Sequence, residues 1–82
     1  MTIPTLSTVA RHFDAHGGLW LVIPRRTDKG QPRPLFALLG VAQGPLGPFI
    51  TYEGGDLRAT IESNENLQGA EWAPVDARGT RV

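Results

Sequence analysis

The sequence predicts an α+β fold, with an N-terminal helix packed on a four- to five-stranded antiparallel sheet or on a small open β-barrel. Helical spacing of apolar residues is confined to the first sixteen residues, and the apolar runs that follow are short and separated by Gly- and Pro-rich turns. The 82 residues suffice for one small hydrophobic core. We therefore expect a single compact domain over residues 1–75 and a flexible C-terminal tail over 76–82.

The first element is a predicted amphipathic helix over residues 5–16. Its expected apolar face consists of Leu6, Val9, Ala10 and Phe13, which recur at helical spacing. Thr5 or Ser7 can cap the start, and Gly17-Gly18 can end the helix in a left-handed turn.

Five later segments have the composition of strands, namely residues 19–23, 35–43, 49–53, 57–62 and 70–75. The fourth follows a tight-turn signal, Gly54-Gly55, and alternates so that Leu57, Ala59 and Ile61 would point inward. The aromatic residues are expected to lie mainly in the core: Phe13, Trp20, Phe36, Phe49, Tyr52 and Trp72.

A basic, proline-punctuated turn over residues 24–34 separates the first two apolar runs. A type I turn ending at Gly30 predicts a hairpin in which Trp20 faces Leu38 and Val22 faces Phe36. The same register places Pro24, Pro32 and Pro34 at non-hydrogen-bonded sites, where they would block further strands. The sequence therefore predicts a β-hairpin arm that projects beyond the sheet.

The candidate partner-binding residues lie on this arm: Arg25, Arg26, Lys29 and Arg33. The predicted register sets Arg25 opposite Arg33, and an anionic partner would relieve their repulsion. The first 33 residues carry five basic and two acidic side chains, whereas the remainder carries three basic and six acidic ones, although the formal net charge is zero. Arginine is well suited to carboxylate and phosphate groups, so we expect an acidic protein surface as partner. Splaying of the arginines into water is the simpler alternative.

These features favour a small non-catalytic protein-binding module, an inhibitor or adaptor of bacterial or phage origin that acts through the basic arm. The origin rests on analogy with small phage-encoded inhibitors. A nucleic-acid-binding protein that uses the same arginines is the alternative, although six acids in the second part of the chain oppose it. A structural subunit that forms homo-oligomers is a second alternative.

No enzyme, cofactor or metal centre is expected. Ser7 and Ser63 lie in no nucleophile motif, and Gly54-Gly55 leads into a predicted strand rather than a phosphate-binding helix. His12 and His16 have helical metal-ligand spacing but lack a third ligand in the sequence pattern. The chain has no cysteine, secretory signal pattern or membrane-length apolar run, so we expect a cytoplasmic protein without membrane contact.

Overall fold

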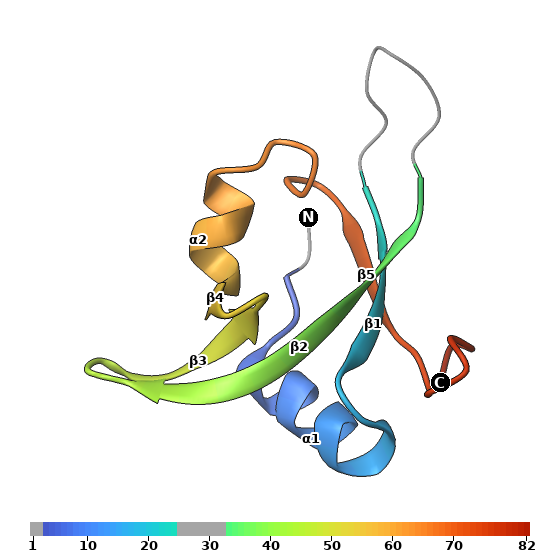
Figure 1. The fold of residues 1–82 in the computed structure, drawn as a ribbon, viewed down its shortest axis with the longest axis horizontal. Coiled ribbons are helices and arrows are strands. Elements are labelled where there is room, and N and C mark those ends of the chain that lie inside the picture. The colour runs from blue at the N-terminus through green and yellow to red at the C-terminus, as the bar shows by residue number, and fades with distance from the viewer. Residues whose placement is uncertain (1–2, 25–32) are drawn as a thin grey trace.

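The computed structural model describes residues 3–24 and 33–82, which form two helices and one antiparallel sheet (Figure 1). The elements in chain order are α1 (Leu6–His16), β1 (Leu19–Ile23), β2 (Leu35–Gly44), β3 (Gly47–Tyr52), β4 (Gly55–Asp56), α2 (Leu57–Glu62) and β5 (Glu71–Pro74). The strand order is β4-β3-β2-β1-β5. The predicted α+β class with an N-terminal helix on a five-stranded antiparallel sheet is confirmed, and the described sheet is not closed into a barrel.

β2 is the central strand, and it changes neighbours halfway along its length. Its first half pairs with β1 as far as Leu38, and its second half pairs with β3 from Leu39 onward. β3 returns after a two-residue loop, because Gly44 pairs directly with Gly47. The sheet is therefore staggered, and β2 curves through the whole molecule (Figure 1).

The hydrophobic core lies on the concave side of this sheet, where α2 and the segment after it close over the strands. Trp20 and Val22 of β1 and Ala37 and Leu39 of β2 are buried there. The remaining buried members of the cluster are Val9, Leu57, Ile61, Leu67 and Ala70. The two helices and residues 67–70 thus cover one face of the sheet, whereas on the other face only the C-terminal turn, at Phe36 and Val75, packs over described strands.

α1 is confirmed as a helix, but its buried face differs from the predicted one. Thr5 caps the start, its hydroxyl accepting from the N–H of Thr8. Val9 and His12 are buried, whereas Phe13 and Ala10 are exposed. His12 turns inward because its Nε2 lies 2.9 Å from the carbonyl oxygen of Leu19, which satisfies a buried polar group at the start of β1.

The predicted fourth strand over residues 57–62 is wrong, because this segment forms α2. Asp56 is its N-cap and accepts from the N–H of Arg58 at 2.9 Å. Leu57 and Ile61 are buried as predicted, but Ala59 is exposed. A spacing of four residues fits both a strand face and a helix face, so the alternation alone could not separate the two. A tight turn does precede this segment, but it lies at Glu53-Gly54, where φ is positive, rather than at the predicted Gly54-Gly55, because Gly55 begins β4.

The predicted register between the first two strands is wrong by one residue. Trp20 pairs with Ala37 rather than Leu38, and Val22 pairs with Leu35 rather than Phe36. A shift of one residue exchanges the two faces of β2, so Phe36 leaves the core that the sequence predicted for it. The smaller Ala37 leaves room for the Trp20 indole on the concave side.

The predicted arm falls largely on residues 25–32, which lie outside the described residues. Residues 76–82, predicted to be a flexible tail, fold back as a turn after β5. The N–H of Asp76 donates to the carbonyl of Thr80 at 2.9 Å, and the N–H of Val82 donates to the carbonyl of Pro74 at 3.2 Å. No helix in the described parts of the chain is long and apolar enough to span a membrane.

Candidate protein-binding face

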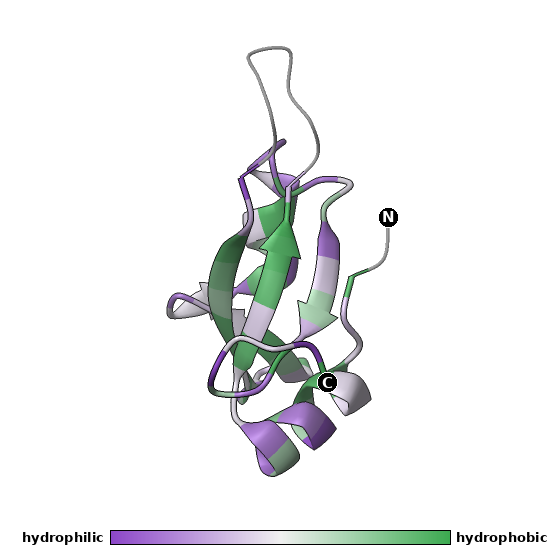
Figure 2. Cartoon of the chain, turned by 90° about the vertical axis from the view of Figure 1, so that its right-hand side faces the viewer, coloured by the Kyte–Doolittle hydropathy of each residue, from purple (hydrophilic) through white to green (hydrophobic). Residues whose placement is uncertain are grey.

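The side of the sheet away from α2 carries a continuous apolar surface across three strands. Register sets Leu19 opposite Leu38, and Leu21 opposite both Phe36 and Ala73, so these side chains share one face. We call these five residues the outer face. In Figure 2, which looks toward this side of the molecule, the strands are largely green, the hydrophobic end of the scale.

Phe36 and Leu38 are the two most exposed members of the outer face. Their side chains are 55% and 70% exposed, while Leu19, Leu21 and Ala73 are half-buried. Because the helices cover the opposite side, no described element packs over Leu38. The outer face thus groups two exposed apolar side chains with three half-buried ones, and clustered exposed apolar residues with a polar border are a common feature of interaction sites.

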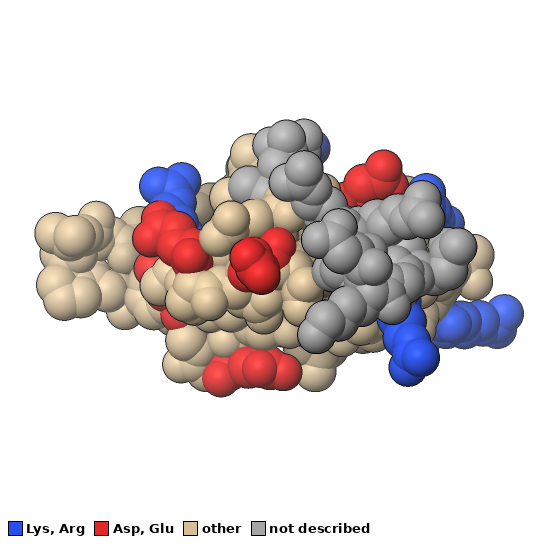
Figure 3. All heavy atoms as spheres, turned by 90° about the horizontal axis from the view of Figure 1, so that it is seen from above, with Lys and Arg blue, Asp and Glu red and all other residues tan. Residues whose placement is uncertain are grey.

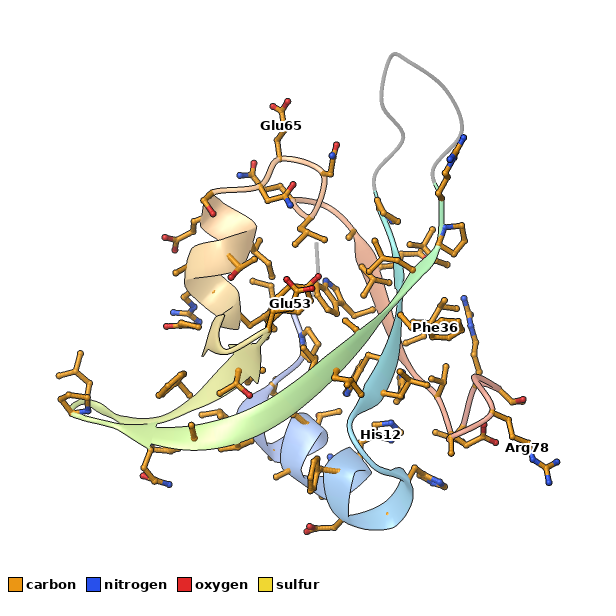
Figure 4. All side chains as sticks on the ribbon, viewed as in Figure 1. His12, Phe36, Glu53, Glu65 and Arg78 are labelled. Atoms are coloured by element: carbon orange, nitrogen blue, oxygen red, sulfur yellow. The ribbon has the colours of Figure 1, made fainter. Side chains whose placement is uncertain are left out.

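The C-terminal turn borders one end of the outer face. The Phe36 ring lies against Gly79, where an added Cβ would stand 3.0 Å from the ring. Asp76 holds this turn through Oδ1, which accepts from the N–H groups of Arg78 and Thr80 at 2.9 and 3.0 Å. Arg78 is exposed on the same side of the molecule as Phe36 (Figure 4).

Arg33 is the one predicted partner-binding residue within the described chain. It is exposed and lies two positions before β2, next to the strand that carries Phe36 and Leu38. The other predicted site residues, Arg25, Arg26 and Lys29, lie outside the described residues. The structure therefore brings one of the four predicted arginine-arm side chains to the border of the outer face.

Acidic side chains lie mainly on the other side of the molecule. Glu53 and Glu65 are on the side of α2, away from Phe36 and Arg78 (Figure 4). Seen from above, the acidic spheres gather mainly in the left half and the basic ones mainly in the right half (Figure 3). Among the described residues, acidic and basic side chains therefore lie mainly on different sides of the molecule.

Sequence reasoning missed Phe36 and Leu38 as candidate site residues. Every residue from Leu35 to Leu39 is apolar, so the run has no polar alternation to show which side chains face solvent. The size match between Trp20 and Ala37 was the available signal, because it favours the register that turns Phe36 and Leu38 outward.

The two histidines are neighbours on α1 but differ in burial. His12 is buried against Trp20 in an edge-on contact with ring centroids 5.4 Å apart, and His16 is exposed at the end of α1. The two imidazole centroids also lie 5.4 Å apart. Over residues 3–24 and 33–82, no three His, Cys, Asp or Glu side chains gather in a way that could hold a metal ion.

Comparisons with protein-family models, with curated proteins and with solved structures found no match to this chain. A functional assignment therefore rests on the side chains of the outer face and on the groups at its border.

Proposed function

We propose that the protein is a small non-catalytic binding module, an inhibitor or adaptor that recognises a protein partner through the outer face. The observation that carries this proposal is the exposure of Phe36 and Leu38 within an apolar surface spanning three strands. Contiguous apolar surface with a polar border is typical of protein interaction sites. An exposed aromatic ring with arginines on the same side of the molecule is typical in composition of interfaces and their energetic hot spots.

The border of the outer face points to a partner with acidic groups around an apolar centre. Arg33 lies two positions before β2, and Arg78 lies in the C-terminal turn on the same side of the molecule as Phe36. Guanidinium groups at an interface rim attract carboxylates during encounter and disfavour basic partners. Contacts by Arg25, Arg26 and Lys29 remain part of this proposal, since they continue the same basic segment in the sequence.

Affinity capture from a lysate of the source cell, treated with nuclease and analysed by mass spectrometry, tests this function. Leu38→Glu places a charge at the centre of the outer face and should weaken capture about tenfold or more, a typical hot-spot loss. Ala59→Glu is the matched control, because it adds the same charge to an exposed position of α2. The double variant Arg25→Glu with Arg33→Glu should weaken capture mainly at low salt.

Three results would count against the proposal. The first is the absence of a specific protein partner, and the second is equal capture by Leu38→Glu and the wild-type chain. The third is capture of nucleic acid alone from a parallel lysate that has not been treated with nuclease. The last result, with affinity that falls steeply as salt rises, would favour the nucleic-acid alternative.

A further inference from the structure

The sheet has several free edges, and the register shows which backbone groups point outward along each. The N–H of Leu39 donates to the carbonyl of Gly18 at 2.8 Å, toward β1. Backbone groups alternate sides along a strand, so those of Val41 and Gln43 point the same way as those of Leu39. β1 has ended there, and within the described residues no hydrogen bond to Val41 or Gln43 is seen on that side.

Proline occupies an outward-pointing position at each of three other free edges. Pro74 lies in β5, where its carbonyl also accepts from Val82, and Pro48 lies in β3 beyond its short pairing with β4. Pro34 directly precedes the part of β2 that extends past β3. A proline removes the N–H that an added strand would need, which is a common way to protect an edge.

The second half of β2, residues 40–44, lacks such protection. The segment Gly40-Val41-Ala42-Gln43-Gly44 has neither proline nor a charged residue. A groove of about 380 Å³ lies between its first part and α1, lined by Ala10, Phe13, Asp14, Gly40, Val41, Ala42 and Thr51. Val41 is 42% exposed beside it. This edge is therefore open to another strand.

We infer that a second copy of this chain occupies this edge, with the two β2 strands antiparallel about a two-fold axis through Ala42. In this register Val41 of each copy lies opposite the partner's Gln43. Both residues point their N–H and C=O groups outward. Each of the two symmetry-related Val41–Gln43 pairs therefore forms two backbone hydrogen bonds, four in all. Gly40 faces the partner's Gly44, which keeps the added strand thin where α1 stands closest.

A second copy fits this edge better than a charged peptide does. The paired segments are neutral, so two identical edges meet without like-charge repulsion. The same register carries Leu46, fully exposed at the β2–β3 loop, toward the end of the partner's α1. Phe13 is exposed at that end of the helix, so two uncovered apolar side chains approach each other.

Sedimentation equilibrium and light scattering across about 1 μM to about 1 mM protein test this dimer, since weak self-association falls in that range. The wild-type chain should shift from monomer to dimer. Gln43→Pro removes an outward N–H and should raise the dissociation constant at least about tenfold. Gln43→Ala keeps that N–H and should dimerise like the wild type. Gln43→Lys, which places charge on the edge, should weaken the dimer if the proline variant fails to fold.

A chain that stays monomeric up to the highest concentration overturns the inference, as does a dimer that neither Gln43→Pro nor Gln43→Lys weakens. Binding of an unrelated extended peptide at this edge in place of a second copy also overturns it. Phe36→Glu lies on the outer face, four positions before the paired segment, and should weaken partner capture while leaving the dissociation constant of the dimer unchanged. Failure of the proposed partner binding and failure of the dimer are therefore measured separately.

Discussion

Tyr52 gives a residue-scale test of the sheet's inner surface. Burial raises the pKa of its phenol, and the neighbouring Glu53 carboxylate adds to the rise. A pKa raised in the folded state means that folding stability is fully present below the unfolded value of about 10 and falls as pH rises above it. Since Tyr52 is the chain's single tyrosine, absorbance titration reports its pKa directly.

We expect Glu53→Gln to lower the measured pKa of Tyr52. We expect Tyr52→Phe to remove part of the loss of folding stability between about pH 9 and about pH 11. This window is set by the usual phenol pKa of about 10. Glu65→Gln removes a carboxylate from a loop on the same side and serves as the control. A Tyr52 phenol that titrates at its ordinary pKa in the folded protein would contradict the partial burial of its ring.

Burial was predicted correctly from the sequence for some apolar side chains and incorrectly for others. Trp20 and Val9 are buried as expected. Phe13 and Phe36 are not, because burial depends on helix rotation and strand register as well as on hydrophobicity. The inward turn of His12 depends on the carbonyl of Leu19, a neighbour that only the folded chain supplies.

At the scale of elements, Asp56 decides where α2 begins. We expect Asp56→Ala to lower the free energy of unfolding by about 1 kcal/mol, because the N–H of Arg58 then loses its acceptor. Urea denaturation measures this difference. Glu65→Ala removes an equal charge outside the helix and should change stability far less. Equal losses in the two variants would show that the cap contributes little.

The C-terminal turn provides a second test at this scale. Gly79 has φ +85° and lies against the Phe36 ring. Gly79→Ala should therefore strain the turn by about 1 kcal/mol or more and speed hydrogen exchange at the amides of Asp76 and Thr80. Ala77→Ser, an exposed change in the same turn, is the control. Unprotected amides at both positions in the unaltered protein would instead support the flexible tail predicted from sequence.

Most elements were predictable because turn residues mark their ends. Gly17, the Gly44–Gly47 loop and the turn at Gly54 all mark real boundaries. Residues 57–62 were not, because apolar positions at 57, 59 and 61 satisfy a strand pattern while the capping carboxylate at 56 favours a helix. The cap was the decisive signal, since it satisfies amide groups that a helix start otherwise leaves unpaired.

At the scale of the whole molecule, the fold class could be predicted from the spacing of apolar residues and from the Gly- and Pro-rich turns, but the candidate surface could not. The one-residue register difference moves a phenylalanine and a leucine from the expected core to the outer face. The outer face and the open edge of β2 are distinct surfaces. A dimer joined through residues 40–44 would carry two outer faces, and two linked sites bind a repeated or dimeric partner with higher avidity than one.

The sharing of β2 between two neighbours also has a kinetic consequence. Its pairing with β3 closes a two-residue loop, whereas β1 and β5 join segments from opposite ends of the sequence. Closing a long loop costs more chain entropy than closing a short one, so distant strands dock after local hairpins have formed. We expect the β2–β3 hairpin to belong to the folding nucleus and the docking of β5, which completes the outer face, to be the late step.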